Sequence, residues 1–375
     1  MTLYIRFTSK NLKHLLYFLI FITLGCKKQP LQNKTEKVKR TVLIYVAGNN
    51  NLRSDALQSL NKIEMGAKDI DGNVIVFIKT NSKTSVLLKI KYDNTSHIVS
   101  DTIKIYTDQN SSDPKFLSQV IEDSRLLSPA DSYGLVMWSH ATSWSPALLK
   151  TKSFGSDDNR EMDILDFKNA IPSDFEYIMF DACSMGSMEV IYELKDKAKY
   201  LLVSPSEVLS SSFPYNTILP LLFRDEVDLR NVCRHFIDYY DSLSGAHSSA
   251  TVSLVRTSEL NLLGSLTKTL LDSNKLSNKI NTSNLQRLDF DITTRVAAYD
   301  FLSFLNQNFD NSKITLITSQ LDKAILYKGH TKTFLNIPIK EFCDISIYLT
   351  KEKDYLLAYY MQLSWYKAGG WNNLF

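Results

Sequence analysis

The stretch YIMFDACSMGSME (177–189) decides the fold because it joins a short apolar run directly to a cysteine and a turn of small residues. Such a run predicts a buried strand, and the residues after Cys183 predict a helix. The same order occurs upstream, where the apolar part of YGLVMWSHATSW (133–144) ends on His140. Both side chains are therefore expected at the ends of central strands.

Apolar strands and amphipathic helices alternate from Thr41 onward, beginning with TVLIYVA (41–47) and NVIVFIK (73–79). This alternation predicts an α/β fold with a mostly parallel sheet flanked by helices. The segments SVLLKIKYD and HIVSDTIKI add an expected antiparallel hairpin around Asn94. Beyond residue 216 the pattern becomes helix-rich, and one helix is expected over 284–308.

The chain divides into four expected regions. They are a signal peptide (1–25), a flexible tether (26–40), an α/β domain (41–225) and a helix-rich C-terminal accessory region (226–375). Residues 141–158 have no sustained period and predict a long exposed loop. Loops longer than about 12 residues are usually functional or mobile.

The N-terminus has the composition of an export signal. Three basic side chains precede an unbroken apolar run (15–24), which is shorter than the about 20 residues that a membrane-spanning helix needs. The run ends in TLGC (23–26), which resembles the lipobox of bacterial lipoproteins. The resemblance implies lipidation of Cys26 and anchoring to a membrane of the cell envelope. An ordinary secretory signal is the alternative.

Charge favours neither nucleic acid nor an anionic membrane surface as a partner. Removing residues 1–25 takes away three positive charges and no negative ones, which lowers the formal charge from +3 to zero. We therefore expect a monomer that binds no nucleic acid and contacts the membrane through its lipid. Lys27 and Lys28 follow the lipidated position, and the absence of acidic residues there favours the periplasmic face.

Four cysteines follow the signal: Cys26, Cys183, Cys233 and Cys343. None belongs to a CxxC or Cys/His cluster, so a structural zinc site is not expected. Cys233 and Cys343 could pair in an oxidising compartment, but two separate buried thiols are the favoured arrangement.

His140 and Cys183 can meet because side chains at the carboxyl ends of neighbouring parallel strands face a common crevice. A thiol becomes a strong nucleophile when an imidazole takes its proton, and the same imidazole can protonate a leaving amine. The backbone N–H groups of Cys183 and Ala141 are candidate oxyanion donors. Either side chain alone has an ordinary alternative, since a strand-end cysteine is often only a small buried hydrophobe.

Both motifs resemble those of the clostripain family of cysteine peptidases. FDACSMGSMEVIYEL (180–194) is similar to the nucleophile motif of that family, and 133–144 to its histidine motif. The likeness extends to TVLIYVAGNNNL (41–52) and SPSEVLSSSFPYNTIL (204–219). It implies a caspase-like fold, a Cys/His dyad and cleavage after basic residues.

The resemblance also implies a substrate pocket. Asp181 occupies the acidic position that relatives use to pair an arginine or lysine side chain, and its alternative role is to cap the next turn. Glu207 corresponds to a recurrent acid that contacts ligand or supports the pocket. Trp144 and Tyr215 are expected to wall the cleft, or else to be ordinary half-buried aromatics.

Two positions depart from the family pattern His-Gly-x-Gly-Trp, because Ala141 and Ser143 replace its glycines. If either position requires a positive φ, the turn is strained by roughly 1 to 3 kcal/mol. The amide at position 141 survives, so the oxyanion donor is retained.

Relatives are often zymogens that are cut between the two motifs. Lys152 and Lys150 are the expected self-cleavage positions within 145–160, Lys152 slightly favoured, unless they are incidental lysines of a solvated loop. No cofactor is expected. Calcium at the acids Asp157, Asp158 and Asp163 is the remaining alternative, although no EF-hand spacing occurs.

These observations predict an endopeptidase that cleaves peptide bonds after Arg or Lys through an acyl-enzyme. One alternative is a weak or inactive caspase-like lipoprotein that binds peptides or a partner protein, which the altered turn at 141–143 favours. Another is an amidase or transpeptidase that acts on cell-wall peptides with the same dyad.

Overall fold

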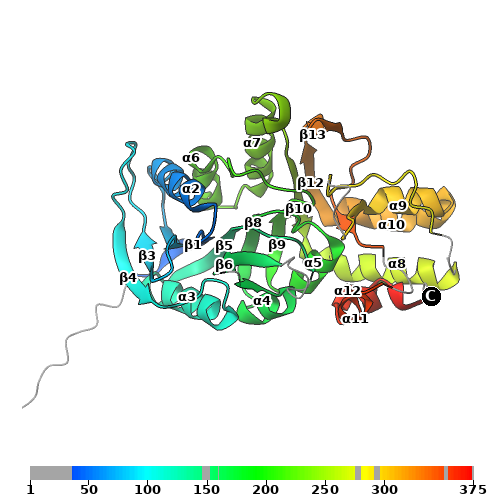
Figure 1. Ribbon diagram of the computed structural model, residues 1–375, viewed down its shortest axis with the longest axis horizontal. Helices are drawn as coiled ribbons and strands as arrows, with labels where there is room; N and C mark the ends of the chain where they lie inside the picture. Colours follow the sequence, from blue (N-terminus) through cyan, green and yellow to red (C-terminus); the bar gives the residue numbers. More distant parts are fainter. Residues whose placement is uncertain are drawn as a thin grey trace, which may run out of the picture. The chain divides into compact units, whose positions relative to one another are not determined.

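The computed structural model describes residues 36–145, 153–158, 160–274, 280–290, 296–349 and 354–373. From Lys37 onward these residues form one compact unit around a nine-stranded sheet (Figure 1). The expected signal peptide, the predicted lipidation site Cys26 and most of the expected tether lie outside the described residues.

The central strands of the sheet are parallel, and antiparallel strands extend both edges. The strand order is β12-β10-β9-β8-β5-β1-β2-β3-β4, with parallel pairing from β9 to β2. The antiparallel hairpin of β3 and β4 confirms the predicted one. The strands are β1 (Val38–Ala47), β2 (Asn73–Lys79), β3 (Thr84–Lys89), β4 (Asp101–Thr107), β5 (Ala130–Trp138), β8 (Phe175–Asp181), β9 (Ala198–Val203), β10 (Thr251–Arg256) and β12 (Ile325–His330).

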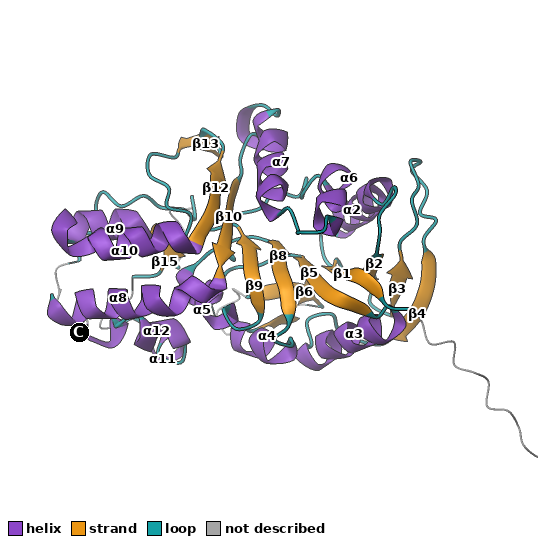
Figure 2. Cartoon of the chain, turned by 180° about the vertical axis from the view of Figure 1, so that it is seen from behind, coloured by secondary structure: helices purple, strands orange, loops and turns teal. Residues whose placement is uncertain are grey.

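Helices cover both faces of this sheet (Figures 1 and 2). One face carries α2 (Arg53–Gly66), α6 (Tyr215–Ile218) and α7 (Leu229–Asp241). The other carries α3 (Pro114–Leu127), α4 (Ile164–Ala170) and α5 (Met188–Leu194). A strand buried on both faces must be apolar throughout, which explains the near-continuous hydrophobic runs at β1, β5 and β8.

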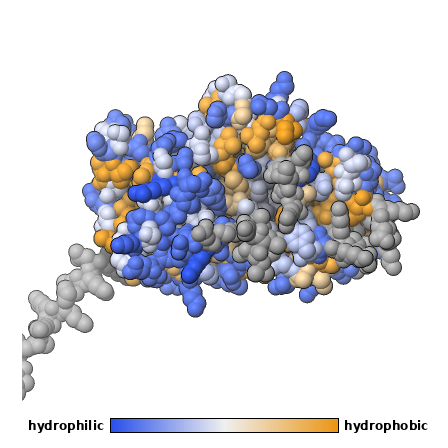
Figure 3. Space-filling view, in the orientation of Figure 1, coloured by the Kyte–Doolittle hydropathy of each residue, from blue (hydrophilic) through white to orange (hydrophobic). Residues whose placement is uncertain are grey.

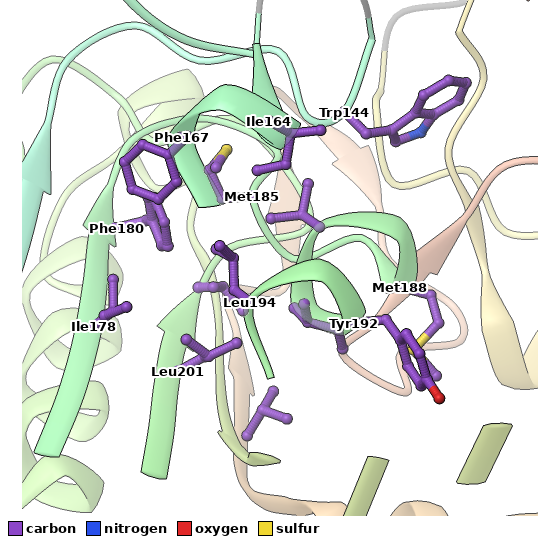
Figure 4. Close-up of a cluster of buried hydrophobic side chains, with 14 of the residues drawn as sticks. Trp144, Ile164, Phe167, Ile178, Phe180, Met185, Met188, Tyr192, Leu194 and Leu201 are labelled. Atoms are coloured by element: carbon purple, nitrogen blue, oxygen red, sulfur yellow. The ribbon is translucent and has the colours of Figure 1, made fainter. Parts of the chain in front are cut away.

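Strand β8 illustrates how its residues divide between the two layers. Ile178 and Phe180 pack in the layer of α4 and α5, where Phe180 contacts Phe167 at a centroid distance of 5.7 Å (Figure 4). Tyr177 and Met179 pack in the layer of α2, α6 and α7. Because side chains alternate along a strand, Asp181 is expected in the latter layer.

The C-terminal region is part of the same fold. Its strands β10 and β12 extend the sheet beyond β9, so the predicted division at 225/226 does not coincide with a break in the sheet. The helices of this region are α8 (Leu260–Ser273), α9 (Phe301–Asn308), α10 (Asn311–Ala324), α11 (Leu357–Tyr360) and α12 (Ser364–Ala368). Short strands elsewhere in the chain are β6 (Phe154–Asp157), β7 (Arg160–Met162), β11 (Tyr299–Asp300), β13 (Thr333–Phe334), β14 (Ile337–Pro338) and β15 (Ser346–Ile347).

The helix predicted over 284–308 is wrong for the described residues 284–290 and 296–300. Among the described residues of this range the helix is Phe301–Asn308, because Asp300 adopts extended backbone and caps the helix by accepting a hydrogen bond from the Ser303 amide (2.9 Å). Before it, the Leu288 amide donates to the Ala298 carbonyl, which folds the segment back on itself.

The expectation of an exposed loop over 141–158 is also wrong where the structure describes it. Phe154 is fully buried in the core. Asp157 is buried and accepts hydrogen bonds from Lys79 Nζ (2.7 Å) and Asn49 Nδ2 (2.6 Å), and its pKa is lowered by these bonds against the opposing effect of burial. The ion pair fixes the β6–β7 hairpin against the end of β2.

Cys183, Cys233 and Cys343 are all free thiols, which confirms the expected separate thiols for the last two. Within the described residues, no helix has the length and apolar character required to span a bilayer. On the face drawn in Figure 3, hydrophilic side chains separate several smaller hydrophobic patches.

The turn after β5 has the backbone strain that its sequence suggested, at one of the two substituted positions. Ser143 has φ +68°, in the left-handed region that favours glycine, whereas Ala141 does not have a positive φ. The Ser143 hydroxyl donates to Ser187 Oγ at 2.8 Å, and Ser187 caps α5. Its hydrogen bond therefore offsets part of the strain.

We predict that the free energy of unfolding separates these two effects. Ser143→Ala keeps the strain and loses the hydrogen bond, so it should destabilise the protein by about 1 kcal/mol. Ser143→Gly loses the same bond but also removes backbone strain of similar energy. Its free energy of unfolding should therefore stay within about 0.5 kcal/mol of that of the natural protein. Urea unfolding of the three proteins measures this order, and equal loss in both variants would contradict it.

Candidate active site

The register between β5 and β8 sets the positions of His140 and Cys183. Trp138 pairs with Asp181 at the ends of the two strands. His140 and Cys183 each follow two residues later, so the two side chains occupy equivalent positions beyond neighbouring strands.

Both side chains line one cavity of about 370 Å³. Its wall combines the segment after β5, the start of α5 and part of the C-terminal region. The predicted accessory region thus supplies part of the site. The cavity residues used below are His140, Ala141, Trp144, Glu161, Cys183, Ser187, Glu189, Glu207, Asp289 and Tyr348.

His140 is oriented by Asn51, from the turn after β1. The His140 Nε2 atom lies 2.7 Å from Asn51 Oδ1. An amide oxygen only accepts, so this bond holds the proton on Nε2 and leaves Nδ1 available as a base. Partial burial lowers the pKa of His140, which keeps the ring neutral at pH 7.

The Cys183 thiol is half-buried and makes two hydrogen bonds to the backbone of Val208. Its Sγ accepts from the Val208 amide (3.4 Å) and donates to the Val208 carbonyl (3.6 Å). Burial raises the pKa of Cys183 to about 11, and the charges of Glu207 and Asp181 add to the rise. In this arrangement the sulfur is a neutral thiol at pH 7.

The Ala141 amide faces the sulfur. Its N–H stabilises the thiolate and so lowers the pKa of Cys183, against the larger effect of burial. The residue is held by a β-bridge to Phe154, and the Gly155 amide donates to the His140 carbonyl at 2.9 Å. A fixed amide near the nucleophile remains a candidate oxyanion donor.

Asp181 lies behind the cavity rather than in its wall. It is only 4% exposed, and its Oδ2 accepts from Ser212 Oγ, the Phe213 amide (3.4 Å) and Tyr215 Oη (2.8 Å). Burial raises the pKa of Asp181 to about 6 against the lowering by these bonds. Tyr215 is fully buried in this cluster and does not line the cavity.

Glu207 and Trp144 do line the cavity. Glu207 is exposed, whereas Trp144 is buried against C-terminal aromatic rings. Its ring centroid lies 5.1 Å from that of Tyr348 and 5.0 Å from that of Tyr360. The tryptophan therefore joins the histidine segment to the C-terminal region.

The predicted self-cleavage lysines and the acids considered for calcium do not form part of the described cavity. Lys150 and Lys152 lie outside the described residues. Within the described residues, no group of three or more acidic, histidine or cysteine side chains could hold a metal ion. Asp157 pairs with Lys79, and Asp163 caps α4, so both carboxylates serve the protein's own structure.

Sequence reasoning did not identify Asn51, Val208 or Glu189. Asn51 could have been found, because it lies in the polar turn after the first central strand, at the same edge as His140. Val208 acts through its backbone, which no residue type indicates. Glu189 lies among apolar residues of α5, and only its burial and its place in the cavity wall single it out.

Comparison with known proteins agrees with this geometry. The sequence profile described as the clostripain family matches residues 44–375. Clostripain of Hathewaya histolytica is 25% identical over 226 residues, which are 50% of this chain and 42% of that protein. The matched region thus spans less than half the length of this curated relative.

Two solved structures share the fold over 89% of this chain and 99% of their own. A secreted C11 cysteine protease from Bacteroides thetaiotaomicron in complex with an irreversible peptide inhibitor is similar with a TM-score of 0.79 and 25% identity. An inactive zymogen C11 protease from Parabacteroides distasonis is similar with a TM-score of 0.77 and 29% identity. The mostly parallel sheet with its helical layers is therefore the caspase-like fold of these proteases. Since the family profile spans the sheet, the cavity and the C-terminal region alike, the chain belongs to the clostripain family.

Proposed function

We propose that this protein is a cysteine endopeptidase that cleaves peptide bonds after arginine or lysine through an acyl-enzyme. The observation that carries the proposal is the shared cavity of His140, Cys183 and the Ala141 amide. A nucleophile, a base and an oxyanion donor at one surface are the groups that acyl transfer requires.

In the proposed reaction, His140 Nδ1 takes the thiol proton and the Cys183 sulfur attacks the carbonyl carbon of the substrate. The Ala141 and Cys183 amides donate to the resulting oxyanion. The His140 imidazolium then gives its proton to the leaving nitrogen as the carbon–nitrogen bond breaks. Water, deprotonated by the same imidazole, attacks the thioester and releases the acid product and the free thiol.

Charge around Cys183 supports a basic residue on the acyl side of the bond. Asp181 and Glu207 both lie close enough to raise the pKa of the thiol. A lysine or arginine side chain beside these carboxylates would offset their charge and so favour the thiolate. All three hydrogen bonds described for Asp181 go to Oδ2, and Oδ1 takes part in none of them.

We predict a preference that depends on Asp181. The mature protein should cleave fluorogenic peptides ending in Arg or Lys at least about 100-fold faster, in kcat/KM, than those ending in Ala or Asp. Asp181→Asn should lower kcat/KM for the basic peptides by about tenfold or more, since its amide oxygen still accepts from Ser212 and Tyr215 while the charge is lost. Cys183→Ala should have no activity.

Three other results would contradict the proposal in different ways. Equal cleavage of all four peptides would remove the basic preference. No cleavage, with stoichiometric labelling by a thiol-reactive probe, would favour an amidase or transpeptidase. Neither cleavage nor labelling would favour an inactive peptide-binding lipoprotein.

We also propose activation by self-cleavage between the two motifs. Support comes from the ends of this loop, where Ser153 Oγ donates to the Ser145 carbonyl at 3.2 Å and the Thr142 amide donates to the Ser153 carbonyl at 3.2 Å. Strands β5 and β8 flank the loop and pair with each other in the sheet. A cut at Lys152 or Lys150 would therefore leave two associated chains.

Intact-mass analysis tests this activation. The purified protein should give two fragments that meet at residue 152 or 150, and these should co-elute in size-exclusion chromatography because the sheet holds them together. Cys183→Ala, and a variant with both lysines changed to alanine, should remain whole. A single unbroken chain in every protein would contradict self-cleavage.

We propose, finally, that the protein is exported and anchored through a lipid on Cys26. The structural neighbour from Bacteroides thetaiotaomicron is described as secreted, and the sequence TLGC (23–26) resembles a lipobox. In detergent-phase partition, the natural protein should enter the detergent phase and Cys26→Ala the aqueous phase, because the acyl chains are lost. Aqueous partition of both would indicate an ordinary secretory signal.

A further inference from the structure

Glu189 is a buried carboxylate in the wall of the cavity that holds His140 and Cys183. It lies in the first turn of α5, six residues after Cys183, and is 0% exposed. The reaction proposed above makes no use of it. An ionisable group at this position requires a physical explanation, since a buried charge is costly unless it is paired.

Only one of the two Glu189 oxygens is engaged in the described structure. Oε1 accepts from the Tyr348 amide (2.9 Å) and from Tyr360 Oη (3.0 Å). Oε2 is buried and has no hydrogen-bond partner among the described residues. The Ser187 hydroxyl and the backbone amide of Glu189 also lower the pKa of this carboxyl, but neither makes a hydrogen bond to Oε2.

Glu193, one helical turn further along α5, makes the comparison direct. It is also buried, but both oxygens are engaged: Oε2 by Lys168 Nζ (2.6 Å) and Ser364 Oγ (3.1 Å), and Oε1 by the Ser364 amide. It does not line the cavity. Both oxygens of Glu193, which faces the C-terminal helices, are therefore hydrogen bonded. Glu189, which lies beside the cavity, has one oxygen that accepts no hydrogen bond among the described residues.

The composition of the cavity indicates the charge of the missing partner. Its lining includes the carboxyl groups of Glu161, Glu189, Glu207 and Asp289, and no lysine or arginine among the described residues. Glu161 and Glu207 have partners of their own, so the carboxylate with an unengaged oxygen is that of Glu189. Asp289 is paired with Arg287. Burial raises the pKa of Glu189 to about 7, so near neutral pH a nearby cation would draw the side chain into its charged form.

The position of the cavity indicates which part of a substrate enters it. The imidazole that takes the thiol proton must return it to the leaving nitrogen, so the leaving chain lies on the side of His140. The cavity continues from His140 along the segment to Ser145 and reaches α5 at Glu189. Asp181 lies instead in the layer of Tyr215, on the other face of the sheet.

We infer that the part of this cavity next to Glu189 is a subsite for a basic side chain on the leaving-group side of the scissile bond, with Glu189 as the residue that pairs with it. The inference rests on the proposed endopeptidase function and extends it. A lysine ammonium or arginine guanidinium that enters the cavity supplies the hydrogen bond that Oε2 lacks. The protein is thereby selective for basic residues on both sides of the bond it cleaves.

The test uses internally quenched peptides that carry lysine before the scissile bond and lysine or glutamine at the first or second position after it. The mature natural protein should prefer the lysine peptide at one of these positions by about tenfold in kcat/KM, as one charge-assisted hydrogen bond allows. Glu189→Gln should reduce this ratio to about one, because its amide oxygen preserves the bonds from Tyr348 and Tyr360 while the charge is lost. The glutamine peptide is the reference within each protein.

Glu193→Gln is the matched control, since it also removes a buried charge from α5 but lies outside the cavity. It should keep the tenfold ratio. Glu189→Asp, which retains the charge, should keep at least part of it and serves as the second variant if Glu189→Gln does not fold. The subsite is rejected if the kcat/KM ratio of the lysine to the glutamine peptide is one in the natural protein, or if Glu189→Gln leaves this ratio unchanged. Either result leaves the endopeptidase function standing.

If no peptide is cleaved, the proposed function fails, and binding then decides the subsite by itself. Fluorescence anisotropy with the same peptides should give about tenfold tighter binding of the lysine peptide to the natural protein and equal binding of both peptides to Glu189→Gln. Equal affinities in the natural protein overturn the inference.

Discussion

The parallel pairing of β5 with β8 is the constraint on which the rest of the structure depends. Because Trp138 pairs with Asp181, the two residues that follow each strand end put His140 and Cys183 at the same edge of the sheet. A shift of one residue in this register would turn one strand's side chains to the opposite layer. Each layer is filled by large apolar side chains, as Figure 4 illustrates for the one that contains Phe167 and Phe180. The packing of the core therefore fixes the register, and the register fixes the relative positions of His140 and Cys183.

Burial and charge together set the protonation states of the two candidate catalytic side chains. Burial and the carboxylates of Asp181 and Glu207 hold the proton on Cys183, and partial burial keeps His140 neutral. Both effects oppose the thiolate–imidazolium pair. In the proposed function, a cationic substrate would change this balance, because it would compensate the carboxylates beside the thiolate as it forms. The carboxylates that restrain the free protein are then the same ones that we propose select its substrate.

The sequence was sufficient for the parts of the fold that follow local rules. The strand NVIVFIK (73–79) occurs with the predicted bounds, because its continuous apolar run determines it. The segment 154–157 was mispredicted because its structure depends on distant partners: Phe154 enters the core, and Asp157 pairs with Lys79. The described residues 284–290 and 296–300 were predicted as helix, but the Leu288 amide donates to the Ala298 carbonyl instead of to a carbonyl one helical turn away. Asp181 was predicted by position, but its enclosure by Ser212 and Tyr215 depends on a loop folding back over β8.

The C-terminal region explains why the cavity could not be found in the histidine and cysteine motifs alone. Tyr348 and Tyr360 pack on Trp144 and also donate to Glu189, so one pair of aromatic residues fixes both the turn after β5 and the first turn of α5. The turn after β5 holds His140 and the Ala141 amide, and the first turn of α5 holds Glu189. Removal of the C-terminal region would thus take away part of the cavity wall and the aromatic rings that pack on Trp144. The site is consequently a property of the whole compact unit, and the predicted accessory region belongs to it.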